Sequence, residues 1–292
     1  MSDTPAPATG QATGEGAGQA TGQGARLRRP AAFFDLDKTV IAKSSTLAYA
    51  KPFYRGGLIT RRAVLRSGYA QFVFSSAGAG HDQMERMRAY LSAMCTGWDV
   101  EHVKAIVAET LHDLIDPMVY DEAADLIEQH HASGRDVVIV SSSGTEVVEP
   151  IGELLGADHV IATQMEIVDG RYTGEIGWYV YGSAKAEAIR QLAEIESYDL
   201  SQSYAYSDSA TDLPMLEAVG HPCAVNPDRA LRQAAARRGW PVLDFHQPVP
   251  LRGRFSDLRS TRPAMAAAAV GAGAAAAGLV WYAARRRTPR AG

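Results

Sequence analysis

The sequence predicts an α/β protein whose mostly parallel sheet is connected by crossover helices. Between about Arg29 and Val249, short apolar runs alternate with longer stretches of helical periodicity, which is the pattern that βαβ units produce. The runs are largely apolar rather than alternating, as expected of strands that are covered on both faces. The composition, 46% hydrophobic and 21% charged, is that of an ordinary globular core.

Each expected element follows from its own stretch of sequence. Strands are expected at AAFF before Asp35, DVVIV before Ser141, HVIAT at 159–163, SYAYS before Asp208 and PCAV at 222–225. Helices are expected at about Tyr120–Ala132, Thr145–Leu155, Ser183–Glu194, Thr211–Ala218 and Pro227–Arg238. The segment EIVDGRYTGEI predicts a β-hairpin, because Asp169-Gly170 lies between alternating residues.

The stretch from 44 to 118 breaks this alternation. It contains several helical patterns in a row, MERMRAYLSAM and DVEHVKAIVAETLHDLI among them. An all-helical insertion after the first strand is expected to form a lid over the face of the sheet where ligands bind.

The first 29 residues are interpreted as a disordered arm. They are rich in Gly, Ala and Thr, and the first 25 contain no large apolar side chain beyond Met1, so they bury too little surface to offset the entropy of ordering. They also lack the apolar centre of a secretory signal. We therefore expect the domain that follows to stay in the cytoplasm.

Residues 264–284 are a candidate transmembrane helix. This stretch has 21 residues and no charge, enough to cross a hydrocarbon core of about 30 Å. Trp281 and Tyr282, followed by arginines at 285–287, are typical of a membrane interface. The alternative is an Ala-rich soluble helix. A basic linker at 250–263 precedes the candidate span and a basic tail at 285–292 follows it.

Charge and cysteine content exclude other classes of site. The net charge is −4 and no strongly basic domain is present, which argues against nucleic acid as a partner. Only Cys95 and Cys223 occur, without metal-ligand spacing, so neither a disulfide framework nor a zinc site is indicated.

Reactive side chains gather at the expected strand ends and helix starts. Several carboxylates in one pocket repel one another unless a hard cation binds them, and Mg²⁺ prefers such oxygen ligands. A lysine and a serine hydroxyl beside them suit a phosphoryl group, and a carboxylate can attack phosphorus. Because ligands of open α/β sheets bind at the carboxyl ends of the strands, we expect one pocket to contain Asp35, Asp37, Ser141, Lys185, Asp208 and Asp212.

Four motifs resemble, in order, those of the haloacid dehalogenase superfamily of phosphohydrolases: FFDLDKT, VIVSSSG, GSAKAEAIR and YSDSATDLPML. The resemblance covers roughly residues 31–225 and is greatest to subfamily IB, the subgroup that contains phosphoserine phosphatase. It implies the Rossmann-like sheet of this superfamily over 30–249, with a helical cap of the C1 type at about 44–118. One Asp-x-Asp pair alone would be weak support, whereas four ordered motifs are specific.

The resemblance also implies roles for the matching residues. Asp35 is similar to the nucleophile that becomes phosphorylated, and Asp37 to the general acid and base. Thr39 either orders the turn after the nucleophile or contacts the phosphate. The other phosphate-binding residues implied are Ser141, Ser142 and Lys185. Mg²⁺ would be held by the side chain of Asp35, the carbonyl of Asp37 and the side chain of Asp208, supported by Asp212.

Two positions depart from the pattern of the family. Ser207 stands where glycine usually precedes the aspartate, and it is expected to crowd the turn without removing a ligand. Ser44 stands nine residues after Asp35, where phosphoserine phosphatases usually carry a glutamate for the substrate ammonium. A neutral hydroxyl cannot pair with that charge, so phosphoserine is not the expected substrate.

The leading hypothesis is a Mg²⁺-dependent phosphomonoester phosphatase acting through an aspartyl phosphate on a small phosphorylated metabolite, with its cytoplasmic domain anchored to the membrane by 264–284. Three alternatives remain open. They are phosphoserine phosphatase proper, phosphotransfer to an acceptor other than water, and a membrane-bound interaction protein with a vestigial site.

Overall fold

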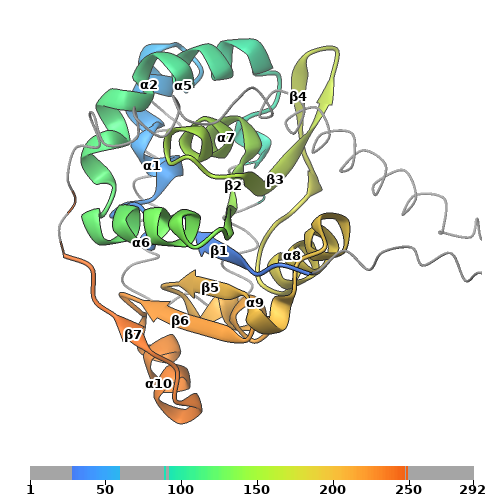
Figure 1. The fold of residues 1–292 in the computed structure, drawn as a ribbon. Coiled ribbons are helices and arrows are strands. Elements are labelled where there is room, and N and C mark those ends of the chain that lie inside the picture. Colours follow the sequence, from blue (N-terminus) through green and yellow to red (C-terminus); the bar gives the residue numbers. More distant parts are fainter. Residues whose placement is uncertain (1–27, 60–88, 90–91, 247, 249–292) are drawn as a thin grey trace, which may run out of the picture.

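A seven-stranded sheet forms the centre of the structure (Figure 1). The computed structural model describes residues 28–59, 89, 92–246 and 248. The strand order is β4-β3-β2-β1-β5-β6-β7, and every pair is parallel except β3 with β4. The expected mostly parallel α/β architecture is confirmed. The strands are β1 (Ala31–Asp35), β2 (Asp136–Gly144), β3 (His159–Val168), β4 (Arg171–Trp178), β5 (Tyr204–Ser207), β6 (His221–Val225) and β7 (Val242–Leu243).

Strand β1 is the central strand, and all five of its residues are buried. It pairs with β2 on one side, where Phe34 lies opposite Ile139, and with β5 on the other, where Phe34 lies opposite Tyr206. The strand order therefore changes direction at β1. The carboxyl end of β1 is the switch point at which open α/β sheets bind ligands.

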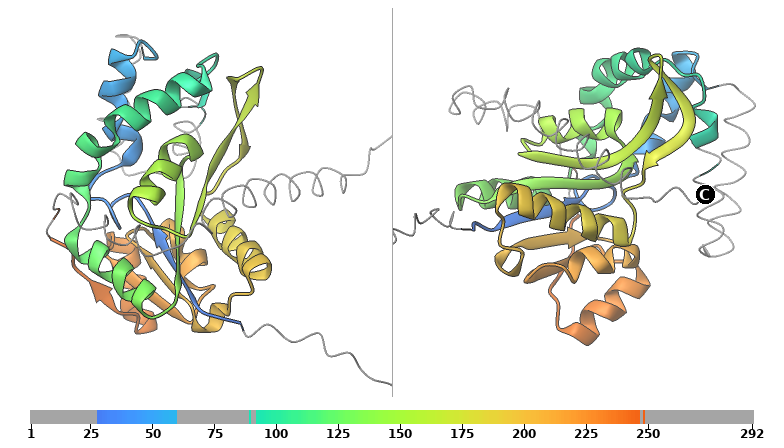
Figure 2. Two further views of the ribbon diagram at one scale, coloured as in Figure 1. Left: turned by 45° about the horizontal axis from the view of Figure 1, so that its top comes forward. Right: turned by 90° about the vertical axis from the view of Figure 1, so that its right-hand side faces the viewer.

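Helices cover both faces of the sheet, which gives three layers (Figures 1 and 2). Neighbouring strand residues point to opposite faces, so Phe34 belongs to the apolar cluster that includes Ile127 of α6, while Phe33 belongs to the one that includes Ile189 of α8. Helices α6 (Asp121–Ala132) and α7 (Thr145–Leu154) pack on the first face. The second face is covered by α8 (Ser183–Glu196), α9 (Leu213–Leu216) and α10 (Arg229–Arg238).

Between β1 and α6, the regular elements that the structure describes are all helices, joined by turns and isolated bridges. Helices α1 (Ser45–Ala48), α2 (Ala50–Arg55) and α5 (Val100–Leu114) are followed by a 3₁₀ turn, η1 (Asp116–Met118). This agrees with the helical insertion expected at 44–118, although most of MERMRAYLSAM lies outside the described residues. Its role as a lid stays a prediction.

The expected β-hairpin is present, with β3 and β4 joined at Asp169 and Gly170. Their φ angles are 50° and 75°, as a two-residue hairpin turn requires. Strand β7 was not expected from the sequence. The single helix expected at 211–218 is wrong: the chain forms η3 (Ala210–Asp212) and then α9, because Pro214 lacks the N–H that would bond to the carbonyl of Ala210.

The predictions for both ends of the chain fall on residues outside the described part. This holds for the arm up to residue 27, the linker at 250–263, the candidate transmembrane helix at 264–284 and the tail at 285–292. Among the helices of the described residues, none is a candidate for spanning a membrane.

Candidate active site

Asp35 is the last residue of β1 and is 7% exposed. After it the chain turns tightly: the N–H groups of Val40 and Ile41 both donate to the carbonyl of Leu36, at 3.0 and 3.1 Å. This turn brings Thr39 back over the strand end, where its Oγ1 donates to Asp35 Oδ2 at 3.3 Å. The hydroxyl of Thr39 therefore helps to orient the carboxylate of Asp35.

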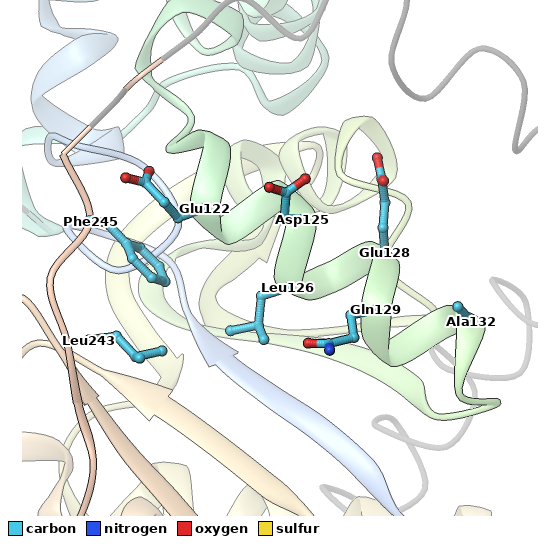
Figure 3. A pocket seen from close by; sticks show the side chains of 8 residues that line it. All are labelled: Glu122, Asp125, Leu126, Glu128, Gln129, Ala132, Leu243 and Phe245. Atoms are coloured by element: carbon cyan, nitrogen blue, oxygen red, sulfur yellow. The ribbon is translucent and has the colours of Figure 1, made fainter.

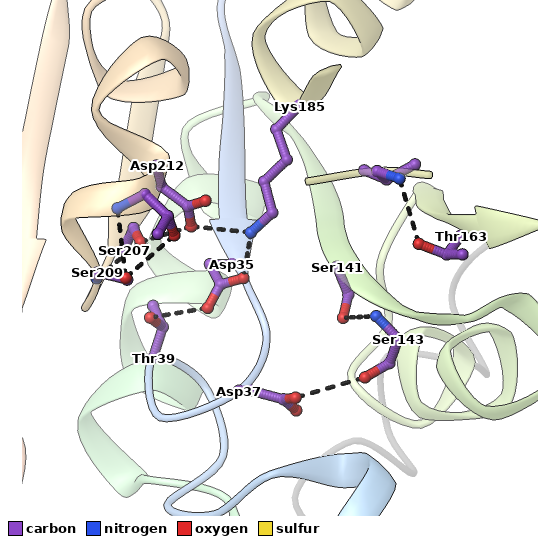
Figure 4. A network of polar contacts seen from close by, with 12 residues as sticks. Asp35, Asp37, Thr39, Ser141, Ser143, Thr163, Lys185, Ser207, Ser209 and Asp212 are labelled. Atoms are coloured by element: carbon purple, nitrogen blue, oxygen red, sulfur yellow. Dashed lines mark hydrogen bonds and ion pairs between the residues drawn. The ribbon is translucent and has the colours of Figure 1, made fainter. Parts of the chain in front are cut away.

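Lys185, near the start of α8, joins two of the predicted carboxylates (Figure 4). Its Nζ donates to Asp35 Oδ1 at 2.5 Å and to Asp212 Oδ2 at 2.8 Å, and all three side chains are buried. Burial lowers the pKa of Lys185, but the two carboxylates more than compensate, so its pKa is raised overall. The ammonium thus stays charged inside the protein.

The site is rich in negative charge. Burial raises the pKa of Asp35 to about 8; the ammonium of Lys185 opposes this effect, while the charges of Asp212 and Asp208 add to it. Burial likewise raises the pKa of Asp208 to about 6. These carboxylates resist ionising together, so a further cation among them would stabilise their charged forms.

Ser207 donates to the same oxygen of Asp212 that accepts from Lys185. The buried Oγ of Ser207 donates to Asp212 Oδ2 at 2.7 Å and accepts a hydrogen bond from the N–H of Ser209 at 3.2 Å. The serine at the expected glycine position therefore takes part in the site rather than only crowding the turn. The sequence pattern does not predict this contact.

The three serines at the end of β2 have different surroundings. Ser141 is 1% exposed, and its Oγ accepts from the N–H of Ser143 at 3.1 Å. The hydroxyl proton of Ser141 is not used in this hydrogen bond and can be donated to another group. Figure 4 shows Ser141 facing the loop that carries Asp37. Ser142 is half-buried, and its side chain makes no hydrogen bond within the part of the chain that the structure describes.

Asp37 is surrounded by donors from the insertion and from β2. Its Oδ1 accepts from the N–H of Ser45 at 2.8 Å, and its Oδ2 from Ser143 Oγ at 3.4 Å and Ser44 Oγ at 3.5 Å. Asp35 and Asp37 thus have separate sets of partners. Ser143 was not predicted as a site residue, although it is the third serine of the VIVSSSG motif.

The donor set at the strand ends suits Mg²⁺. No cluster of three or more His, Cys, Asp or Glu side chains arranged to hold a metal occurs among the described residues. The predicted set does not need one, because it consists of two carboxylates, Asp35 and Asp208, with the carbonyl of Asp37. These are hard oxygen ligands, and Mg²⁺ usually keeps several waters in addition.

A separate hollow of about 590 Å³ lies between α6 and β7 (Figure 3). Its wall includes the carboxylates of Glu122, Asp125 and Glu128, which would repel a phosphoryl group. Neither α6 nor β7 carries any of the predicted catalytic residues. The hollow is lined by Glu122, Asp125, Leu126, Glu128, Gln129, Ala132, Leu243 and Phe245.

Comparison with known families decides what kind of protein carries this site. Residues 32–217 match the model of the family described as haloacid dehalogenase-like hydrolase. The match includes every predicted site residue from Asp35 to Asp212. The chain belongs to the haloacid dehalogenase-like hydrolases. The family expected from the four motifs is confirmed, and with it the prediction that the protein is an enzyme.

The similarity of this hydrolase to known proteins extends over most of its length. It is 71% identical over 264 residues to the "inhibition of morphological differentiation protein" of Streptomyces azureus, covering 89% of this chain and 95% of that protein. It is 61% identical over 259 residues to a probable phosphatase of Mycobacterium tuberculosis, covering 89% of this chain and 90% of that protein. A crystal structure of a protein of unknown function from Bordetella pertussis Tohama I has a TM-score of 0.66 and 31% identity, covering 74% of this chain and 99% of that one.

Proposed function

We propose that this hydrolase is a Mg²⁺-dependent phosphomonoester phosphatase that acts on a small phosphorylated metabolite through an aspartyl phosphate. The observation that supports it most is the separation of the two neighbouring carboxylates. Asp35 is held at the buried strand end by Lys185 and Thr39. Asp37 is held by Ser45 and Ser143. These separate surroundings support a role in attack for Asp35 and a role in proton transfer for Asp37.

In the first step, a carboxylate oxygen of Asp35 attacks phosphorus and the bond from phosphorus to the ester oxygen breaks. Asp37 donates its proton to the departing oxygen, which leaves as an alcohol. The ammonium of Lys185 and the hydroxyl of Ser141 stabilise the negative charge on the phosphoryl oxygens. The product of this step is an aspartyl phosphate on Asp35.

In the second step, Asp37 acts as a base. It takes a proton from a water molecule, the water oxygen attacks phosphorus, and the bond from phosphorus to Asp35 breaks. Inorganic phosphate leaves and Asp35 is again a carboxylate. Thr39 and Lys185 keep Asp35 in the same orientation during both steps, because their hydrogen bonds to the carboxylate are separate from the bond between Asp35 and phosphorus that forms and breaks.

Asp35 and Asp208 would hold Mg²⁺ with the carbonyl of Asp37, supported by Asp212. When bound, the ion would supply positive charge for the phosphoryl oxygens and lower the repulsion among the carboxylates. The raised pKa values of Asp35 and Asp208 support this assignment.

The substrate is proposed to be a phosphate ester other than phosphoserine. The hydroxyl of Ser44 lies 3.5 Å from Asp37 Oδ2, so this position interacts with the proton-transfer residue and offers no charge to an ammonium group. We also propose that residues 264–284 anchor the enzyme to a membrane, on the basis of their 21 uncharged residues and the aromatic and arginine residues at their end.

The test is release of phosphate from an aryl phosphate by the purified protein, with Mg²⁺ and with a chelator. Asp35→Asn should lower Mg²⁺-dependent turnover by more than about a thousandfold, because it removes the nucleophile. Asp169→Asn is the matched control, since Asp169 lies in the hairpin turn, where asparagine also tolerates a positive φ. Undiminished turnover by Asp35→Asn would refute the proposal.

A further inference from the structure

Ser143 connects β2 with the first helix of the insertion. It is 7% exposed, and its Oγ lies within hydrogen-bond distance of three oxygens. These are Asp37 Oδ2 at 3.4 Å, Ser45 Oγ at 2.9 Å and Thr46 Oγ1 at 3.1 Å. Ser45 and Thr46 are the first two residues of α1. Figure 4 shows Ser143 pointing toward Asp37 from the end of β2.

The hydrogen-bonding capacity of a serine fixes the direction of these contacts. A hydroxyl has one proton to donate and two lone pairs to accept with, and an ionised carboxylate can only accept. The proton of Ser143 therefore goes to Asp37 when that carboxylate is ionised. The lone pairs of Ser143 then accept from Ser45 and Thr46, so all three capacities of the hydroxyl are used.

The N-terminus of α1 reaches Asp37 by two routes. The backbone N–H of Ser45 donates directly to Asp37 Oδ1 at 2.8 Å. The side chains of Ser45 and Thr46 reach the other oxygen, Oδ2, through Ser143. Both oxygens of the carboxylate are thus oriented with respect to the start of the insertion and the end of β2.

We propose that Ser143 is a positioning residue that holds the carboxylate of Asp37 in the orientation needed for proton transfer and ties that orientation to α1. This inference rests on the proposed function, since it assigns Ser143 a part in the acid and base steps of Asp37. The hydroxyl of Ser143 contacts Asp37, Ser45 and Thr46, and of these Asp37 is the one with a part in the proposed reaction. Its loss therefore affects the reaction only through Asp37.

The consequence appears in how the rate depends on the leaving group. A poor leaving group such as an alkoxide needs a proton as it departs, whereas a nitrophenolate needs little help. The value of kcat/KM covers the steps up to the first irreversible one, here the departure of the alcohol. Misplacing the acid should thus penalise alkyl phosphates more than activated aryl phosphates.

The experiment measures kcat/KM for a series of alkyl and aryl phosphates with the full-length protein and Ser143→Ala. We expect about a tenfold loss for alkyl phosphates and less than about threefold for nitrophenyl phosphate, so that log(kcat/KM) falls more steeply with leaving-group pKa. Ser143→Thr, which keeps a hydroxyl, should restore the slope. Thr46→Val, at an exposed position, should steepen it by a smaller amount.

The control is Ser203→Ala. Ser203 is also a buried serine, but its Oγ bonds to the backbone of Ala31 and Asp199, so its loss should lower stability and leave the slope unchanged. A slope for Ser143→Ala equal to that of the wild type would overturn the inference. If the wild-type protein shows no turnover that depends on Asp35, that different result would refute the proposed function itself.

Discussion

At the scale of single residues, the site shows how two aspartates separated by one leucine come to differ. Asp35 ends a buried strand and accepts hydrogen bonds from Lys185 and Thr39. Asp37 lies beyond the strand, next to Lys38 with its φ of 64°, and its carboxylate accepts from the start of α1 and the end of β2. The turn that begins at Leu36 therefore gives each carboxylate its own surroundings.

Lys185 is a buried residue whose loss should lower stability. Its ammonium is the cation that bonds to both Asp35 and Asp212 inside the site. Removing one partner from a buried ion pair leaves uncompensated charge, which costs about 3 kcal/mol or more. We expect Lys185→Met to lower the free energy of unfolding of the metal-free protein by about that amount, as measured by urea denaturation.

Lys104→Met is the matched control for that measurement. Lys104 pairs with Glu101 on the surface at 2.9 Å, and exposed pairs of this kind contribute little, about 0.5 kcal/mol or less. If the two variants lost the same amount of stability, the claim that Lys185 neutralises buried carboxylates would be wrong.

Part of the site could be predicted from residue types together with their positions at expected strand ends and helix starts. Asp35, Lys185 and Asp212 were expected to meet, and they do, although Lys185 lies 150 positions beyond Asp35 in the sequence. The contacts of Ser143 and Ser207 could not be predicted. Three serines in a row do not show which of them points into the site, because the register of β2 against β3 shifts between Ser141 and Gly144. Ser207 in place of a glycine likewise does not indicate that its hydroxyl bonds to Asp212.

At the scale of elements, the hairpin of β3 and β4 holds the segment that leads into α5. The N–H of Gly97 donates to the carbonyl of Tyr172 at 2.8 Å, and the N–H of Tyr172 donates to the carbonyl of Trp98 at 3.1 Å. Figures 1 and 2 show this hairpin extending from the sheet toward α5. The hairpin was predicted from Asp169-Gly170, but its pairing with the insertion was not, because local sequence carries no signal for such a distant partner.

Gly174 of β4 sits where the hairpin meets the insertion, and the structure requires glycine there. Its φ is 93°, and a Cβ at this position would lie 2.1 Å from Thr96 Oγ1. Gly174→Ala therefore adds both backbone strain and a steric clash. We expect it to lower the free energy of unfolding by about 1–3 kcal/mol in a denaturant titration.

Gly177, in the same strand, provides the comparison. Its φ is not positive, and the nearest atom to an added Cβ would be the carbonyl oxygen of Gln164 at 3.6 Å, an ordinary contact. Gly177→Ala should change stability by less than about 0.5 kcal/mol. A loss as large as that of Gly174→Ala would show that the close approach at Thr96 is not the cause.

At the scale of the whole molecule, the reactive residues meet because the strand order changes direction at β1. Asp35 is the last residue of β1, Ser141 lies near the end of β2, Asp208 follows β5, and Lys185 lies near the start of α8. The apolar runs predicted β1, β2, β3, β5 and β6 because buried parallel strands leave a strong pattern. Strand β7 has only two residues, too few for any periodicity.

Membrane insertion of residues 264–284 is a prediction that concerns the molecule as a whole. A helix of 21 uncharged residues would span about 30 Å, but most of these residues are alanines, which gain little from lipid. Insertion must then depend on the larger side chains near its end, Leu279, Val280, Trp281 and Tyr282. The two aromatic side chains favour the membrane interface, and the arginines that follow resist entering the hydrocarbon core.

Removing residues 264–292 should therefore move the protein from the membrane fraction to the soluble fraction of cells that express it, as followed by immunoblotting after centrifugation. Removing only 285–292 is the control, since it leaves the uncharged stretch in place and should keep most of the protein with the membrane. An Ala-rich helix that is not inserted predicts the opposite, namely full-length protein already in the soluble fraction. Because the described domain ends before this segment, hydrolysis of an aryl phosphate by the shortened chain should remain within about twofold of the full-length rate.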